Sequence, residues 1–182
     1  MKVTIVRHGE TEYNRNLLLQ GRGNYPLNDE GRRMCHKLRE KTDKIDFDIC
    51  FSSPLIRAVE TAMILVGDRV EIIRDDRIIE RCLGDFEGKD VNFYDSSKYW
   101  DYNLNCGDSN VEPVQDIFKR CNDFLNYLRD NYSDKSVLIV AHGAVVKAFH
   151  YILNNTNLNS NLGKLHIPNC YIETVDYNPK KR

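Results

Sequence analysis

The chain lacks most of the features that mark specialised classes of protein. Its 182 residues include one tryptophan and five prolines, and they contain no internal repeat and no low-complexity linker. No apolar run approaches the roughly 20 residues needed to span a bilayer. The formal net charge is −1, so the overall charge offers no attraction to nucleic acid or to an anionic membrane. We expect neither nucleic acid nor a membrane as a partner.

Paired cysteine motifs are also missing. None of the six cysteines stands in a C-x-x-C pair, which excludes the usual zinc-ribbon spacing and a small disulfide scaffold. Near the N-terminus a short apolar run, Val3–Val6, is followed directly by polar residues, a pattern unlike that of a secretory signal peptide. A reducing cytoplasm is the simplest compartment for such a chain, and we expect no structural metal.

What the chain does have is the composition of a globular domain. Apolar residues make up 41% and charged residues 29%. A chain of this length buries roughly 70% of its unfolded surface, enough for a substantial core. We expect residues 1–182 to form a single domain.

Short apolar runs alternate with helical patterns along this domain. The predicted strands are 3–6, 48–51, 70–73, 137–140 and 171–175. The predicted helices are 29–41 with Asn28 or Asp29 as cap, one from Ser53–Pro54 to Gly67, 114–131, and one from Gly143 to Leu153. This alternation predicts an α/β fold, a three-layer sandwich with a mostly parallel central sheet and helices on both faces. Residues 81–113 show no such pattern, so we expect a small irregular cap over the C-terminal strand ends that acts as a lid or substrate-recognition insertion.

Polar residues follow the predicted strands at their C-terminal ends, where open α/β sheets bind ligands. The first strand ends in Arg7-His8-Gly9, and the fourth ends at His142-Gly143. An imidazole can attack phosphorus, and a guanidinium can hold phosphate oxygens through its planar fork. Taken alone, the first histidine is as well explained by a surface turn as by a catalytic role, and the second is as well explained by a structural role near the core.

Two further candidates lie between these histidines. Arg57 falls about one turn into the second helix, where it can point back over an anion-friendly helix N-terminus. Glu80 precedes a glycine-bracketed loop and is placed to act as a general acid. Taken alone, an arginine on a solvated helix face and an exposed glutamate are the more ordinary interpretations.

In combination and in this order, the four pieces resemble the histidine phosphatase superfamily, also described as phosphoglycerate mutase-like. The resemblance extends from Val3 to about Asp176. Its motifs are Arg-His-Gly-Glu-Thr from Arg7, Ser-Ser-Pro-Leu-x-Arg-Ala from Ser52, a glutamate ahead of Gly-x-x-Glu-Gly, and a distal His-Gly.

The resemblance implies a role for each matched residue and no cofactor or metal. His8 attacks phosphorus and is transiently phosphorylated, and Glu80 protonates the leaving oxygen and then activates water. The residues implied in phosphate or substrate binding are Arg7, Asn14, Gln20, Gly21, Arg57, Glu80, His142 and Gly143. Neighbouring cationic groups should keep His8 unprotonated, as a nucleophile requires.

Some positions depart from the family pattern. Tyr13 and Phe86 stand where tryptophan is common, and Asp108 shortens the acid of a Gly-Glu-Ser turn. None of these positions belongs to the implied catalytic set, but the differences weaken any inference of the substrate from the family.

We expect a phosphatase acting on a small phosphorylated metabolite. Ribazole phosphate, a sugar phosphate, phosphoserine and broad specificity all stay open. The alternatives are a cofactor-dependent phosphoglycerate mutase and a non-catalytic module that binds a phosphorylated ligand. Only 61 residues separate Glu80 from His142, which favours hydrolysis because the mutases of the family carry a larger insertion there.

Overall fold

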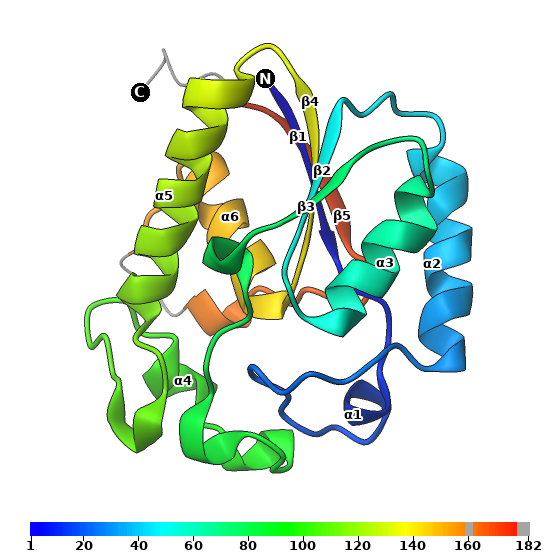
Figure 1. Cartoon of the computed structure of the whole chain (residues 1–182). Helices are drawn as coiled ribbons and strands as arrows, with labels where there is room; N and C mark the ends of the chain where they lie inside the picture. The colour runs from blue at the N-terminus through cyan, green and yellow to red at the C-terminus, as the bar shows by residue number, and fades with distance from the viewer. Residues whose placement is uncertain (159–161, 178–182) are drawn as a thin grey trace.

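Five strands form one sheet in the computed structural model, which describes residues 1–158 and 162–177 (Figure 1). The strand order is β3-β2-β4-β1-β5. The strands span Lys2–Arg7 (β1), Ile49–Ser52 (β2), Ile72–Arg74 (β3), Ser136–Ala141 (β4) and Ile172–Asp176 (β5). The first four run parallel, and β5 pairs antiparallel with β1 at one edge. The prediction of a mostly parallel sheet is therefore confirmed.

The two central strands, β1 and β4, are buried on both faces of the sheet. Successive side chains of a strand point to opposite faces. In β4, Val137 and Ile139 therefore pack into the larger hydrophobic cluster, while Leu138 and Val140 pack into the smaller one on the other face. This two-sided burial explains why both strands are almost continuously apolar in sequence.

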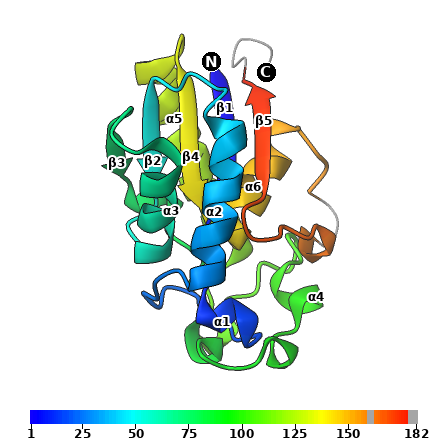
Figure 2. The ribbon, with the colours of Figure 1, turned by 90° about the vertical axis from the view of Figure 1, so that its right-hand side faces the viewer.

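Helices cover both faces of the sheet, as predicted (Figures 1 and 2). One face carries α2 (Asp29–Thr42) and α3 (Ile56–Val66), and the other carries α5 (Val114–Tyr132) and α6 (Gly143–Leu153). Asn28 caps α2, since its side-chain Oδ1 accepts the Gly31 amide at 2.7 Å. The predicted three-layer sandwich is confirmed.

The start of α3 differs from the prediction of a Ser53 cap followed by Pro54. The helix begins at Ile56, and Leu55 before it has extended backbone angles. Asn24, from a loop 32 residues earlier, accepts the Ile56 amide at 2.7 Å and so satisfies a free N–H at the helix start. The Ser53 hydroxyl instead lies 2.6 Å from the ring of His142. A tertiary contact has replaced the local cap that the sequence pattern indicates.

The irregular cap lies beyond the C-terminal ends of the parallel strands (Figure 1). The helical pieces at this end of the sheet are α1 (Glu12–Arg15), α4 (Ser96–Tyr99) and the 3₁₀ turns Gly84–Phe86, Val91–Phe93, Asp108–Asn110 and Leu162–Lys164, whereas the turn Asp76–Ile78 packs against α5. Two loops of the cap are joined by backbone hydrogen bonds, among them Gly88 N to Leu19 O at 2.7 Å and Val91 N to Leu17 O at 2.9 Å. The segment after β1 and the segment after Glu80 are thereby held together over the end of the sheet.

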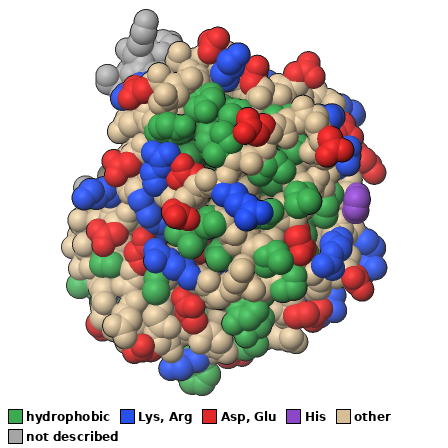
Figure 3. Space-filling model, viewed as in Figure 1, with side chains coloured by type: hydrophobic (Ala, Val, Ile, Leu, Met, Phe, Trp, Pro, Cys, Tyr) green, Lys and Arg blue, Asp and Glu red, His purple; other side chains and the backbone are tan. Residues whose placement is uncertain are grey.

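Charged side chains of both signs are interspersed on the face shown in Figure 3, in keeping with the net charge of −1. Among the residues that the structure describes, no helix combines the length and the apolar character needed to cross a membrane.

Candidate active site

The loop after β1 presents His8 at the C-terminal edge of the sheet. His8 is 2% exposed, and its backbone amide donates to Ala141 O at the end of the neighbouring strand β4. Its ring Nδ1 lies 2.6 Å from Gly9 O. A carbonyl oxygen only accepts, so Nδ1 carries the proton and Nε2 keeps the lone pair.

A close approach of two backbones holds this loop in place. A Cβ on Gly9 would lie 2.7 Å from both Cys35 Sγ and Gly31 O, atoms that belong to α2. On its other side, the Gly9 amide donates to Thr61 Oγ1 of α3 at 3.0 Å. Glycine is required at position 9 because the helix leaves no room for a side chain.

His142 lies beside His8 because β4 is the neighbour of β1. The two ring centroids are 5.1 Å apart, with an interplanar angle of 61°. Nδ1 of His142 is 3.2 Å from Arg57 Nε, which can only donate, so this nitrogen accepts. Nε2 then bears the proton and donates to Ser53 Oγ at 2.6 Å.

Two arginines flank the histidines, one of them fully buried and the other partly buried. Arg57 is fully buried, and its Nη1 and Nη2 donate to Gly23 O at 2.6 Å and Gly21 O at 2.9 Å. Arg7 donates through Nη1 to Ile167 O, and its buried Nε has no hydrogen-bond partner in the part of the chain that the structure describes. An unsatisfied buried donor costs free energy, so the Arg7 guanidinium is suited to an anion that completes its hydrogen bonds.

Glu80 lies at the N-terminal end of α6. Its Oε1 accepts the Arg81 amide at 2.8 Å and the Ala144 amide at 3.2 Å, while Oε2 makes a longer contact of 3.4 Å to the Ala144 amide. Gly143 packs between two of these groups, since a Cβ there would lie 3.7 Å from Arg7 Cζ and 3.9 Å from Glu80 Oε2. The structure thus brings Arg7, His8, Arg57, Glu80 and His142 together at one end of the sheet.

The electrostatics of the cluster favour neutral imidazoles. Burial, followed by the charges of Arg57 and Arg7, holds the pKa of His8 well below its ordinary value. Burial and Arg57 act in the same direction on the pKa of His142. Burial also lowers the pKa of Arg57 to about 10, a value that leaves it charged at neutral pH.

The other sequence-predicted binding residues line the loop next to this cluster. Asn14 Oδ1 accepts the Thr11 amide at 3.2 Å, and Gln20 Oε1 accepts the Thr11 hydroxyl at 3.0 Å. Gly21 has a φ of +48° and offers its carbonyl to Arg57. In this structure all three residues organise the loop through protein contacts.

Sequence reasoning missed three polar residues that support the site. Ser53, predicted only as the start of a helix, contacts the ring of His142, and Thr61, to which no role was assigned, accepts the amide of Gly9 beside His8. Asn169 Nδ2 lies 3.1 Å from His8 O and 3.1 Å from Gly9 O. The Ser-Ser-Pro motif contained a signal for Ser53, whereas nothing around Asn169 in the sequence pointed to the site.

Within residues 1–158 and 162–177, no group of three or more His, Cys, Asp or Glu side chains is arranged to hold a metal ion.

Known proteins with related sequences include phosphatases and phosphoglycerate mutase-like proteins. Residues 3–182 match the model of the histidine phosphatase superfamily, branch 1. The chain is 35% identical over 147 residues to the uncharacterized phosphatase PhoE of Bacillus subtilis, covering 80% of this chain and 74% of that protein.

Two solved structures share the fold over nearly the whole chain. Bacillus stearothermophilus YhfR superposes with a TM-score of 0.87 at 26% identity, covering 98% of this chain and 92% of that one. A phosphoserine phosphatase mutant from Entamoeba histolytica in complex with phosphoserine has a TM-score of 0.85 at 26% identity, covering 98% and 91%. Because the family model spans almost every residue and the five motif side chains meet at one sheet edge, this chain belongs to the histidine phosphatase superfamily, branch 1.

Proposed function

We propose that this protein hydrolyses a small phosphomonoester through a phosphohistidine formed on Nε2 of His8, without a metal ion. The observation that carries the proposal is the 2.6 Å contact from His8 Nδ1 to Gly9 O, which leaves the lone pair on Nε2. Burial and two neighbouring guanidinium groups keep the imidazole neutral, the state in which it is nucleophilic.

The reaction has two displacements at phosphorus. Nε2 of His8 forms a bond to phosphorus as the bond to the leaving oxygen breaks, and Glu80 gives its proton to that oxygen. Water then attacks phosphorus, its proton passes to the Glu80 carboxylate, and the P–N bond breaks to release inorganic phosphate. Of the two carboxyl oxygens, Oε2 is the better proton carrier because Oε1 already accepts two amides.

Charge on the transferring phosphoryl group is stabilised by Arg7, Arg57 and His142. Each Nη of Arg57 keeps a second N–H beyond those given to Gly21 and Gly23, and the Arg7 Nε has no partner in the described chain. His142 contributes the Nε2–H that it shares with Ser53. Asn14, Gln20, Gly21 and Gly143 complete the surroundings of the phosphate, as the family resemblance implies.

The substrate in this proposal is a small phosphorylated metabolite in the cytoplasm. A phosphoserine phosphatase with phosphoserine bound is among the structural neighbours, and so is a putative α-ribazole-5'-phosphate phosphatase of Escherichia coli at 24% identity. Phosphoserine, a sugar phosphate and ribazole phosphate are therefore the substrates to test first, alongside broad specificity.

The test is phosphate release from 4-nitrophenyl phosphate by the wild type, by His8→Ala and by His36→Ala, which removes an exposed imidazole on α2. We expect turnover in the wild type and in the His36 variant, also in the presence of EDTA, and a loss of more than 10³-fold in the His8 variant. Rapid quenching with a labelled substrate should trap an acid-labile, base-stable phosphoenzyme. Label on a serine or cysteine, or strong inhibition by EDTA, would contradict the mechanism.

The same assay separates the two alternatives. A phosphoglycerate mutase would convert 3- to 2-phosphoglycerate without releasing phosphate from 4-nitrophenyl phosphate. A non-catalytic module would retain its biological activity in the His8→Ala variant.

A further inference from the structure

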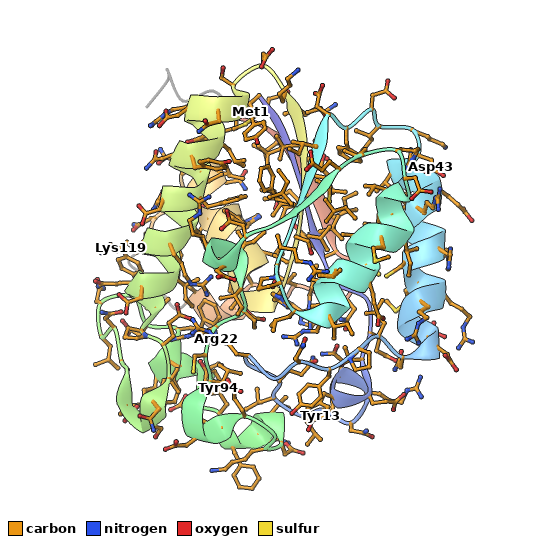
Figure 4. The ribbon with its side chains drawn as sticks, viewed as in Figure 1. Met1, Tyr13, Arg22, Asp43, Tyr94 and Lys119 are labelled. Atoms are coloured by element: carbon orange, nitrogen blue, oxygen red, sulfur yellow. The ribbon has the colours of Figure 1, made fainter. Side chains whose placement is uncertain are left out.

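A cavity of about 380 Å³ extends from Glu80 into the irregular cap. Its walls include Glu80, Arg81, Tyr94, Trp100, Ala144 and Lys147. Lys147 also lines a neighbouring hollow that contains Arg7 and Gly143. Tyr94 lies in the cap beyond the ends of the strands (Figure 4). A ligand in this cavity would thus lie between the cap and the groups that surround His8.

Arg81 is 1% exposed, and among the described residues one of its donor groups has no hydrogen-bond partner. Its Nε donates to Glu112 O at 2.8 Å, and its Nη1 donates to Tyr94 Oη at 3.1 Å. The buried Nη2 has no hydrogen-bond partner in the described part of the chain. Buried donors are almost always satisfied in folded proteins. Since the other two nitrogens are bound to the cap, Nη2 is the group left for a ligand.

Lys147 of α6 is a second buried cation beside the same cavity. Its side chain is 9% exposed, and its Nζ lies 3.3 Å from Gly163 O. Within the described residues, no salt bridge joins an acidic side chain to Lys147 or to Arg81. Burial lowers the pKa of Lys147 to about 8; the negative charge of Glu80 opposes this shift, and the positive charges of Arg7 and Arg81 add to it.

Trp100 holds the two cations at one wall without neutralising them. The Lys147 Nζ lies 4.3 Å from the indole centroid and the Arg81 Cζ lies 4.9 Å from it. Cation–π contacts orient cations but leave their charge uncompensated. A pair of buried cations is costly unless an anion joins them.

We propose that Arg81 and Lys147 form a second anion subsite, which binds a carboxylate or a second phosphate of the substrate while its phosphoester lies at His8. This inference rests on the proposed function and adds the substrate class: phosphomonoesters with a second acidic group on the alcohol. Glu80 lines the cavity and protonates the leaving oxygen in the proposed reaction, so the alcohol portion extends toward Trp100.

Two pairs of esters test the subsite and distinguish its two anions. Phosphoserine and phosphoethanolamine differ only by a carboxylate, and fructose 1,6-bisphosphate differs from fructose 6-phosphate by a second phosphate. We expect the wild type to show a kcat/KM at least tenfold higher for the acidic member of one pair. Lys147→Met, which keeps the side-chain length, should reduce that ratio about tenfold, and so should Arg81→Lys, which removes Nη2.

The matched control is Lys119→Met, which removes an exposed cation from the outer side of α5 (Figure 4) and should leave the ratio unchanged. A wild-type ratio near one for both pairs, or a ratio that neither subsite variant changes, would overturn the subsite even if 4-nitrophenyl phosphate is hydrolysed. If no ester is hydrolysed, the proposed function fails instead.

If no ester is hydrolysed, ligand binding to the His8→Ala variant still tests the subsite. Calorimetry should give a Kd at least tenfold lower for 3-phosphoglycerate than for glycerol 3-phosphate, or for fructose 1,6-bisphosphate than for fructose 6-phosphate. The difference should be lost on adding Lys147→Met. Equal affinities within both pairs would refute the subsite independently of catalysis.

Discussion

At the scale of single residues, their surroundings keep the two buried imidazoles neutral. Hydrogen bonds decide which ring nitrogen of each imidazole carries the proton. His8 uses Nδ1–H on Gly9 O, and His142 accepts from Arg57 and donates to Ser53. Protonating His142 would place an N–H against the N–H of Arg57, and protonating His8 would add a charge beside two guanidinium groups. Both histidines therefore stay neutral in the folded state while the unfolded chain titrates normally.

This difference predicts a pH dependence of stability. Because the pKa of each histidine is lowered on folding, the unfolded state binds more protons below its ordinary pKa of about 6.5, and the free energy of unfolding falls as the pH falls. Between pH 7.5 and 5.5 we expect a loss of about 1.4 kcal/mol for each of the two histidines. Urea unfolding across this range measures the loss.

The controls for that measurement are single substitutions of buried and exposed histidines. His8→Asn should remove about half of the pH-dependent loss, whereas replacing the exposed His36 in the same way should leave it as in the wild type. A wild-type stability that stays flat from pH 7.5 to 5.5 would show that the imidazoles are not held neutral.

At the scale of elements, the geometry of the site depends on the close packing of the loop after β1 against α2. Gly9 packs against Cys35 and Gly31. A Cβ added to Gly31 would in turn lie 2.1 Å from Glu10 O. The loop and the helix therefore approach backbone to backbone. The position of His8 is set by this contact as much as by the strand that precedes it.

A methyl group at position 9 tests the close approach. We expect Gly9→Ala to destabilise the fold by about 2–3 kcal/mol and to lower activity strongly, because Cys35 Sγ and Gly31 O both lie 2.7 Å from the new atom. Adding Cys35→Ala should not restore stability, since the backbone clash with Gly31 remains. Chemical denaturation of the single and double variants measures both effects.

Gly88→Ala separates the cost of an unfavourable backbone angle from the cost of a steric clash. Gly88 has a φ of +81°, but no atom lies within 4 Å of its would-be Cβ. Its substitution should cost only about 1 kcal/mol, the strain of the left-handed conformation. Equal costs at positions 9 and 88 would mean that the contact with α2 is unimportant.

At the scale of the whole molecule, positive charge is buried at one end of the sheet although the net charge is −1. Arg57, Arg81 and Lys147 are buried and Arg7 is partly buried, and the charge of Glu80 offsets part of the lowering that burial causes in the pKa of all four. This end of the molecule is the lower one in Figure 4, where Arg22 and Tyr94 are labelled, and Met1 marks the opposite end. The fold thus carries a stability cost that an anion can relieve.

Inorganic phosphate should therefore stabilise the protein. A ligand present at 100 times its Kd adds about 2.7 kcal/mol to the free energy of unfolding, which raises Tm by several degrees for a domain of this size. We expect such a rise in millimolar phosphate, measured by calorimetry against sodium chloride of equal ionic strength. Arg57→Lys should weaken the effect and Lys119→Met should retain it. A Tm that responds equally to both salts would argue against the anion site.

Local patterns in the sequence were sufficient for the architecture and for the placement of the main site residues. The strands and long helices follow from apolar periodicity, and parallel strands carry whatever follows them to the same edge. His8 and His142 could be paired in this way from sequence because both end buried strands. The predicted Ser53 cap failed for the opposite reason, since Asn24 competes for the helix start through a contact that no local pattern records.

The sequence by itself determined the fold, the family and which side chains gather at the sheet edge. Only the tertiary structure decided the tautomers of the two imidazoles, the support of the His8 loop by Asn169 and the isolation of Arg81 and Lys147 beside Trp100. The hydrogen bond from Asn169 to His8 joins residues 161 positions apart, and that from His142 to Ser53 spans 89. Periodicity reports which face of an element is buried, whereas a hydrogen-bond partner depends on distances between elements that exist only once the chain is packed.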